Sequence, residues 1–326
     1  MTPHQRILAT LNRQPVDRIP VDLWLTPEAL RSMKAHTGRE DELEMYRALE
    51  VDKIVWINPD YRSPGKPEGQ ARNTLWGAPL VEVQSGEATY SEIASAPLAD
   101  MEEPEELDDY PGWPDPDAFD NGPARAAAER ARSFGLATIG PWISHFEIYC
   151  QMRGLENALM DLIDNTEFLE AALERIDSIQ TAMLERFLDD LGDLCDIVFV
   201  SDDLGTQESQ LMSVDQWSTH LKPRLRRWCD IIRSRGKYVL FHTDGAARPF
   251  IPHFIECGVQ ILNPIQHVCP GMERAALKRD FGRDLVFYGG VENQQVIPRG
   301  SPDDVRQEVN TCLDTLGKEG GYIPCS

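Results

Sequence analysis

The sequence predicts an α/β fold, a (β/α)₈ TIM barrel, from three observations. Eight short apolar runs alternate along the chain with segments of helical periodicity. Polar residues directly follow several of these runs, as expected where the parallel strands of a barrel end. No G-x-G-x-x-G follows the first predicted strand, which argues against a dinucleotide-binding open sheet. We therefore expect a single barrel domain over residues 1–326.

Four of the predicted strands lie in the first 200 residues. Each is a mostly apolar run rich in strand-forming residues and too short for a helix. The segments between them carry apolar residues at helical spacing. The expected order is helix 3–12, strand 21–25, helix 40–49, strand 53–57, helix 124–133, strand 136–140, helices 146–162 and 167–191, and strand 196–200.

An insertion over about residues 70–120 interrupts this alternation after the second strand. Segments 74–77, 80–83 and 88–92, with Gly86 between the last two, predict a β-hairpin. The stretch that follows, 97–117, is acidic and rich in proline. It is interpreted either as a solvated loop or as a segment that docks a partner.

The second half of the chain resumes the alternation. Ser213 and Gln216 are spaced as a capping box, and Ser301 followed by Pro302 predicts another helix start. A helix normally covers the last strand of a barrel, so the last helix is missing and we expect a truncated sequence. The expected order is helix 213–236, strand 238–241, helix 246–257, strand 259–262, helix 273–281, strand 285–288, helix 301–316 and strand 320–326.

The composition argues against several classes of function. A formal net charge of −22 and a pI near 4.7 repel nucleic-acid phosphates and anionic lipids. No apolar run approaches the length of a membrane span, and the first residues lack the apolar core of a signal peptide. Seven scattered cysteines without a C-x-x-C pair argue against a disulfide framework or a zinc finger. A cytoplasmic protein without nucleic-acid or membrane partners is expected.

Polar residues at the predicted strand ends form the candidate site. Adjacent Asp202 and Asp203 cannot both face inward, because successive side chains of a strand alternate, so one of them is expected to be structural. His242 is either functional or a structural histidine, and Asp244 before a glycine is often a turn residue. The candidates are Glu147, Asp202, Asp203, Gln207, His242, Asp244, Asn263, Gln266, Glu292 and Cys325.

A metal site is one possible use of these residues. His242 and Cys325 follow or lie on the fifth and eighth predicted strands. Asp244 or Glu147 could complete a mixed nitrogen, sulfur and oxygen site suitable for zinc. The ligands would come from distant strands, so their spacing is not diagnostic.

Several motifs, taken together, resemble one known family. They are found at residues 6–9, 17–21, 110–117, 152–157, 202–207, 242–245, 258–264 and 289–292. The chain resembles the uroporphyrinogen decarboxylase-like superfamily over nearly its whole length. This resemblance implies the same (β/α)₈ barrel that the alternation of strands and helices predicts.

Two branches of this superfamily have different activities. The true decarboxylases carry an arginine-rich segment after the first strand, whereas residues 23–31 of this chain lack it. The resemblance therefore favours the corrinoid-dependent methyltransferases, which transfer a methyl group between a small molecule and the cobalt of a corrinoid protein. Their coenzyme M members bind zinc through His-x-Cys and a later Cys. His242, Asp244 and Cys325 match these positions, with aspartate in place of one thiolate.

This resemblance implies a methyltransferase acting on a small methylated substrate, with an aryl methyl ether, and thus O-demethylase activity, as one candidate. His242 with Asp203 or Asp244 would polarise the leaving oxygen, and Asp202 belongs to the same catalytic set. A corrinoid carrier protein is the expected partner, with the acidic loop assisting its docking. Substrate-binding roles are expected for Glu147, Gln207, Asn263, Gln266 and Glu292.

Two other classes of function stay open. A metal-independent decarboxylase of uroporphyrinogen or a smaller carboxylic acid would use the same strand ends. Its substrate carboxylate would be bound by an arginine such as Arg72, Arg153 or Arg248. A non-catalytic binding subunit is the remaining possibility, and in that case substitution of the histidine and aspartates would have no effect on any activity.

Overall fold

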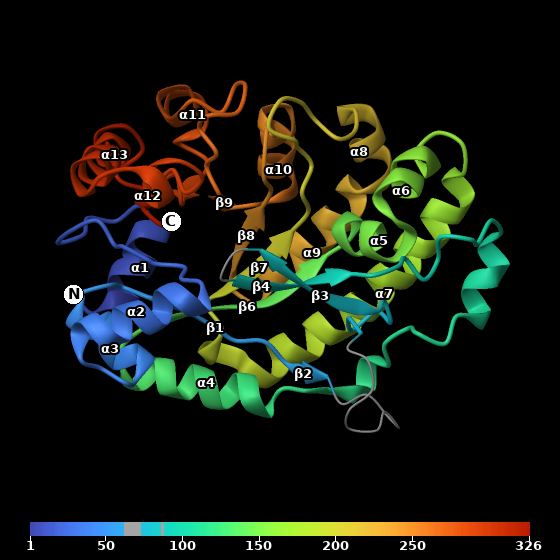
Figure 1. Cartoon of the computed structure of the whole chain (residues 1–326), viewed down its shortest axis with the longest axis horizontal. Coiled ribbons are helices and arrows are strands. Elements are labelled where there is room, and N and C mark those ends of the chain that lie inside the picture. The colour runs from blue at the N-terminus through green and yellow to red at the C-terminus, as the bar shows by residue number, and fades with distance from the viewer. Residues whose placement is uncertain (62–72, 86–87) are drawn as a thin grey trace.

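Seven parallel strands form one curled sheet in the computed structural model, which describes residues 1–61, 73–85 and 88–326 (Figure 1). Successive strands of the sheet are neighbours in space, each joined to the next through helical segments. The α/β class with a parallel sheet is therefore confirmed. In sheet order the strands are β1 (Ile54–Trp56), β6 (Ala137–Ser144), β7 (Ile197–Ser201), β8 (Tyr238–His242), β9 (Ile261–Asn263), β10 (Val286–Tyr288) and β11 (Tyr322–Ile323).

The predicted first strand, 21–25, is wrong as a regular strand. The backbone N–H of Asp22 donates to Pro324 just after β11 (3.1 Å), and Val21 accepts from Asp52 just before β1 (2.7 Å). The segment thus lies between the two edge strands but makes no ladder with either. The physical reason is that the Asp22 carboxylate, rather than a backbone carbonyl, accepts from the N–H of Ile54 (3.2 Å).

Most predicted helices are present, although two of them are divided. Gly154, with φ of 84°, separates the predicted helix 146–162 into two pieces, and a break at Leu221 divides helix 213–236. Two helices, α2 and α12, were not predicted. The helices are α1 (Pro3–Leu11), α2 (Pro27–Thr37), α3 (Glu42–Ala48), α4 (Gly122–Ser133), α5 (Phe146–Arg153), α6 (Leu155–Asp161), α7 (Thr166–Leu191), α8 (Val214–His220), α9 (Lys222–Ser234), α10 (Ile251–Cys257), α11 (Arg274–Phe281), α12 (Val296–Arg299) and α13 (Pro302–Thr315).

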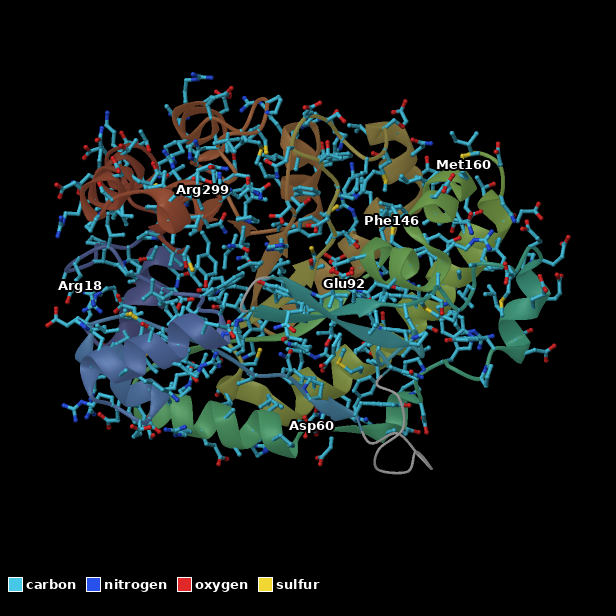
Figure 2. The ribbon with its side chains drawn as sticks, in the orientation of Figure 1. Arg18, Asp60, Glu92, Phe146, Met160 and Arg299 are labelled. Carbon is cyan, nitrogen blue, oxygen red and sulfur yellow. The ribbon has the colours of Figure 1, made fainter. Side chains whose placement is uncertain are left out.

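The insertion contains the predicted hairpin. Strands β3 (Leu80–Ser85) and β4 (Ala88–Ile93) pair antiparallel, while Gly86 lies outside the described residues. A second small sheet pairs β2 (Asp60–Tyr61) with β5 (Phe119–Asp120). Glu92 on β4 and Asp60 on β2 mark the two sheets in Figure 2.

The acidic segment 97–117 packs against the domain through its apolar residues. Leu98 and Leu107 are buried, and the Trp113 indole donates to the Leu107 carbonyl (2.8 Å). Two 3₁₀ turns, Pro104–Asp109 and Pro116–Ala118, shape the segment beside α7. The segment is therefore an ordered covering layer with its carboxylates on the outside. Whether it docks a partner stays a prediction.

Two layers of apolar residues lie on the two faces of the sheet. The inner layer takes alternate residues from every strand and is covered at one end by Ile7 and Leu11 of α1. The outer layer fills the space between the sheet and the surrounding helices. On β8, Leu240 belongs to the inner layer and Val239 and Phe241 to the outer one, as strand alternation requires. In the described part of the chain, no helix is long and apolar enough to cross a membrane.

Candidate functional site

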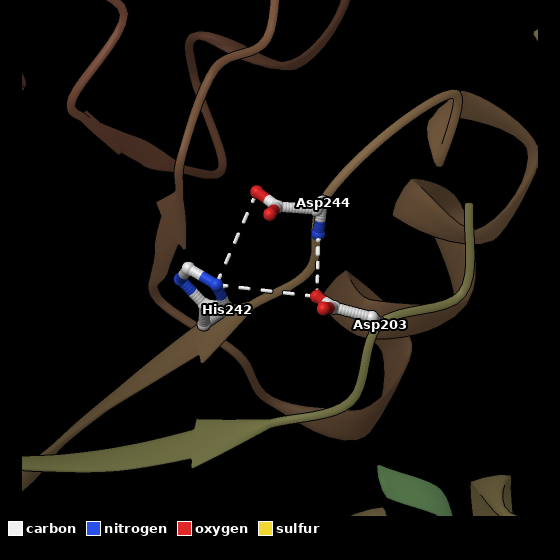
Figure 3. Close-up of side chains that lie close together, drawn as sticks. All are labelled: Asp203, His242 and Asp244. Atoms are coloured by element: carbon white, nitrogen blue, oxygen red, sulfur yellow. Dashed lines mark hydrogen bonds and ion pairs between the residues drawn. The ribbon is translucent and has the colours of Figure 1, made fainter. Parts of the chain in front are cut away.

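Three side chains meet where β7 and β8 end. His242 is the last residue of β8 and, two positions after Leu240, continues its inward face. Its Nε2 lies 3.9 Å from Asp203 Oδ1 and 4.0 Å from Asp244 Oδ1 (Figure 3). Their candidate ligand atoms all lie within 4.8 Å of one another, and no other such His, Cys, Asp and Glu group occurs among the described residues. We call these three residues the His–Asp cluster.

The imidazole of His242 is held in one tautomer. The amide of Asn263 donates from Nδ2 to the Tyr288 carbonyl (3.1 Å), which directs its Oδ1 towards His242. That oxygen is 2.6 Å from His242 Nδ1, so Nδ1 carries the hydrogen and donates it. The lone pair or second proton of the ring is therefore on Nε2, which faces the two carboxylates. A histidine ordered this way is suited to bind a cation or hold a proton at Nε2.

Aromatic rings surround the histidine on its inner side. The Trp24 ring is stacked at 6.4 Å between centroids, and the Phe199 ring lies at 5.3 Å. The Trp24 indole donates to the Tyr288 hydroxyl (2.8 Å), which itself donates to the buried carboxylate of Asp22. These contacts fix Trp24 against the cluster and leave the imidazole less room to turn.

The loops that carry the two aspartates touch each other backbone to backbone. A Cβ added to Gly245 would lie 2.4 Å from the Thr206 carbonyl oxygen, and one on Gly205 would lie 2.6 Å from the nitrogen of Ala246. Only glycine allows this approach, and Gly245 also has φ of 80°. The N–H of Asp244 donates to Asp203 Oδ1 (2.9 Å), so the loop backbone itself connects the two acids.

Burial disfavours the charged form of two carboxyl groups in this region. Burial, opposed by His242 and reinforced by Asp203, raises the pKa of Asp244. Burial also raises the pKa of Glu147 to about 7, although the Ser201 hydroxyl donates to it (2.9 Å). Glu147 can therefore carry a proton near neutral pH.

Two residues of the His–Asp cluster, His242 and Asp244, line a cavity of about 430 Å³ at the carboxyl ends of the strands. The lining includes Trp24, His242, Asp244 and His267 and, among the described residues, contains no lysine or arginine. A cavity of this size fits a small organic molecule. The remaining lining residues are Asn263, Pro264, Ile265, Gln266, Val268, Gly289, Gly290, Val291, Glu292, Asn293, Gln294 and Ser326.

Asp202 is placed apart from the cluster and has structural partners. It is buried, and its Oδ1 accepts hydrogen bonds from the Ser144 hydroxyl (2.8 Å) and from the backbone of Phe146 (2.7 Å) and Glu147 (2.9 Å). It thus caps the first turn of α5, whose first residue, Phe146, is labelled in Figure 2. Asp203 and not Asp202 joins His242, as strand alternation required of one of them.

The other predicted residues are divided between the cavity and its support. Gln266 accepts from the N–H of Gly245 (2.5 Å), and Glu292 accepts from three backbone N–H groups at the start of α12. Gln207 is exposed and does not line the cavity; its amide oxygen accepts a 3.5 Å hydrogen bond from the Cys269 thiol. Cys325 is buried in the inner layer with Tyr288 and is outside the cluster. Burial and the nearby Asp22 raise the pKa of its thiol.

Comparison with known proteins identifies the family. A family model described as uroporphyrinogen decarboxylase matches residues 81–325, well over half of the chain. The chain belongs to the uroporphyrinogen decarboxylase family. The predicted resemblance to the superfamily is therefore confirmed, while its methyltransferase branch is only suggested.

Two solved structures resemble this member of the uroporphyrinogen decarboxylase family. A methyltransferase from Methanosarcina mazei has a TM-score of 0.65 at 17% identity, covering 100% of this chain and 92% of that chain. At this identity the likeness shows the fold alone. A 3-keto-D-glucoside 4-epimerase from E. coli matches more weakly, with a TM-score of 0.37 at 15% identity, covering 62% of this chain and 75% of that chain. The comparison with curated proteins gave no match.

In this family member, the donors of the His–Asp cluster fit a divalent metal such as zinc. One imidazole nitrogen and two carboxylates form a nitrogen and oxygen set that zinc accepts. Asn263 supplies the outer hydrogen bond that orients a ligating histidine. The set differs from the predicted pair of His242 and Cys325, because Asp203 takes part and the thiol does not.

Asn263 and His267 show what sequence reasoning missed. Asn263, predicted to bind substrate, lines the cavity, and its amide also orients His242, a role that the sequence did not indicate. His267 lines the cavity with its Nε2 only 3.4 Å from Glu308, a carboxylate supplied by α13. Its place one residue after Gln266, at the end of a strand, was the available signal.

Proposed function

We propose that this chain is a methyltransferase that moves a methyl group between a small methylated substrate and a corrinoid carried by a partner protein. The observation that carries the proposal is the His–Asp cluster, whose His242 and Asp244 line a 430 Å³ cavity at the ends of parallel strands. Fold similarity to the Methanosarcina mazei methyltransferase over the whole chain supports it. An aryl methyl ether is one substrate class that such a cavity would admit, since Trp24 provides an aromatic wall.

The same proposal includes a complete (β/α)₈ barrel. Segment 21–25 occupies the position between β11 and β1, with one backbone hydrogen bond towards each edge. This segment would take the place of the eighth strand of the barrel. The Asp22 carboxylate would replace one of the backbone carbonyls that a regular strand offers to its neighbour. The cavity would then be the barrel mouth, where barrel enzymes place their active sites.

Methyl transfer from an ether or amine requires help for the leaving heteroatom, because an unassisted alkoxide leaves poorly. Glu147 lies outside the cavity lining, beside Ser201 at the end of β7; it can hold a proton near pH 7 and would donate it to a leaving oxygen that reaches this end of the strand. His242, oriented by Asn263, directs Nε2 towards the same region, and Asp203 and Asp244 hold the negative charge that balances a cation there.

Two bound groups would complete this chemistry. His242, Asp203 and Asp244 would hold a divalent metal, which supplies a Lewis acid for the heteroatom when bound. The corrinoid, when docked with its carrier, supplies the cobalt centre that exchanges the methyl group. The residues of this chain would orient the substrate, hold the proton and keep the methyl group in a single orientation.

The lining of the cavity does not favour the decarboxylase alternative. A polycarboxylate substrate needs cationic partners, and the described lining has none apart from its histidines. Arg153 is buried in contact with Asp161, and Arg248 binds Asp280 and the Gly271 carbonyl (3.0 Å). Arg72 lies outside the described residues.

Methyl transfer to free cob(I)alamin from a panel of methylated substrates tests the proposal. We expect transfer by the wild type, loss of nearly all of it in His242→Ala, and no change in His36→Ala. His36 is an exposed histidine on α2 and serves as the matched control. Wild-type rates in a folded His242→Ala protein would refute the assignment.

Metal content separates the two possible ligand sets. We expect about one zinc per chain, as in structural and catalytic sites of this donor type, lost in Asp203→Asn and retained in Cys325→Ser. Mass spectrometry on protein purified without added metal measures it. Loss of zinc in the cysteine variant, with Asp203→Asn unaffected, would return the site to His242 and Cys325.

A further inference from the structure

A larger cavity, of about 660 Å³, lies at the opposite edge of the sheet. It is bounded by the C-terminal ends of α11 and α13 and by Arg13, which follows α1. Arg13 reaches the carbonyl of Leu285, directly before β10, whereas the His–Asp cluster follows the ends of β7 and β8. The two cavities therefore belong to different faces of the molecule.

This cavity is basic although the whole chain carries a formal charge of −22. Arg279 is paired with Asp280 (2.7 Å), and the other four cations of the lining outnumber its two carboxylates, Asp314 and Glu319. In the described part of the chain, Arg283 and Lys318 form no ion pair or side-chain hydrogen bond, so their charges are free to attract an anion. The cationic side chains that line the cavity are Arg13, Lys278, Arg279, Arg283 and Lys318.

Two of the cations are fixed by carbonyl groups rather than by acids. The Arg13 guanidinium donates to the carbonyls of Gly282 (2.7 Å) and Leu285 (2.8 Å), and Lys278 donates to Gly320 (2.5 Å). The acceptors are the carbonyl at the end of α11 and two loop carbonyls that precede β10 and β11, so these contacts orient the side chains without neutralising them. Burial lowers the pKa of both groups, and the opposing effects of Asp284 on Arg13 and of Glu319 on Lys278 are smaller than that of burial.

An adjoining cavity of about 360 Å³ shares Arg13 and Glu319 with the first. Its lining includes Thr10, which is 3% exposed, and the Thr10 hydroxyl has no hydrogen-bond partner. A buried hydroxyl without a partner is unusual and can be satisfied by a ligand or by water. Arg13 thus stands between a basic cavity and an unused hydroxyl donor, held there by a left-handed backbone with φ of 56°.

We propose that these two adjoining cavities, which share Arg13 and Glu319, bind a small phosphate-bearing molecule. The guanidinium groups of Arg13 and Arg283 and the ammonium groups of Lys278 and Lys318 surround a space large enough for more than one phosphate. Phosphate oxygens would accept from the free N–H groups and from the Thr10 hydroxyl. This binding site does not depend on the proposed methyl transfer, and the two proposals can be tested separately.

Calorimetric titration of the full chain with inorganic phosphate, pyrophosphate and ATP tests the proposal. We expect pyrophosphate to bind with Kd of about 1 mM or tighter, and the double variant Arg283→Gln/Lys318→Gln to bind it at least about 10-fold more weakly. Both side chains are exposed and without partners in the described structure, so their replacement leaves the fold intact. Arg39→Gln, an exposed arginine beyond α2, is the matched control and should bind as the wild type does.

The three ligands distinguish the sources of the phosphate. Tighter binding of ATP than of pyrophosphate would support a nucleotide-like ligand, and the reverse would support a free polyphosphate. No heat of binding with any of the three, or equal affinity in the wild type and the double variant, would overturn the proposal. Thr10→Val should weaken binding of the same ligand while leaving thermal stability unchanged or raised, because it removes an unpartnered buried hydroxyl.

Discussion

Replacement of Asp202 distinguishes a structural role from a catalytic one. Asp202→Ala removes three hydrogen bonds at the start of α5 and leaves their buried donors without partners. Each of the three donors left unsatisfied costs at least about 1 kcal/mol, so we expect a loss of about 3 kcal/mol or more. Asp202→Asn keeps an acceptor oxygen in the same place and should lose about 1 kcal/mol or less.

The pH dependence of stability provides a second test of the structural role of Asp202. Burial raises the pKa of Asp202 from 3.8 to about 6, so its ionisation costs more in the folded than in the unfolded chain. Stability contributed by the protonated form is present at low pH and is lost as pH rises through about 4 to 6. The full difference corresponds to about 3 kcal/mol, of which about 1.5 kcal/mol falls between pH 5 and 8.

Urea unfolding measured from pH 5 to 8 checks both expectations. The free energy of unfolding of the wild type should decrease from pH 5 to 8. In Asp202→Asn this decrease should be smaller by about 1.5 kcal/mol. Methyl-transfer rates of the folded Asp202→Asn protein should stay close to wild type. An Asp202→Ala protein with undiminished stability and no activity would refute the structural role and restore Asp202 to the catalytic set.

Three further predictions concern the neighbouring groups. Burial raises the pKa of Glu147 to about 7, so the rate of methyl transfer from an ether should fall as pH rises through about 7. The Glu147→Gln variant should be slower than the wild type at every pH, and its pH–rate profile should lack this decline. Asn263→Leu removes the acceptor that orients His242 and should lower kcat about 10–100-fold, measured against metal content in the same preparation. Gly245→Ala must displace the facing loop, whereas Gly38→Ala, at a similar φ, has open space around the new methyl group. Thermal unfolding should therefore show a loss of stability well over the roughly 1 kcal/mol expected for Gly38→Ala. Equal losses in the two variants would contradict the backbone contact.

The sequence predicted the sheet well because apolar runs of strand length are a direct consequence of burial on both faces. The prediction was wrong at 21–25, where the Asp22 carboxylate instead of a backbone carbonyl accepts the hydrogen bond from Ile54. The hydrophobic pattern of the segment is the same in both cases, so it could not reveal this difference. Helix α2 carries clear end signals, a capping Thr26 before Pro27 and a left-handed Gly38, that could have been found. The division at Gly154 depends on a backbone angle that composition alone does not specify.

At the site, strand alternation predicted which residues could meet but not what each would do. His242, Asp203 and Asp244 meet because parallel strands bring their carboxyl ends to one edge. Gln266 and Glu292, predicted to bind substrate, line the cavity and also accept hydrogen bonds from loop backbones, a second role that the sequence did not indicate. Side-chain direction beyond a strand depends on the loop's dihedral angles, which local sequence pattern does not determine.

The contact between Gly205 and Gly245 has a consequence for the motion of the two loops. Because two peptide backbones meet there, the loops that carry Asp203 and Asp244 cannot move independently of each other. Under the metal binding proposed above, the two carboxylates would approach a cation from fixed backbone positions, and only rotation of their side chains could adjust the distance between them.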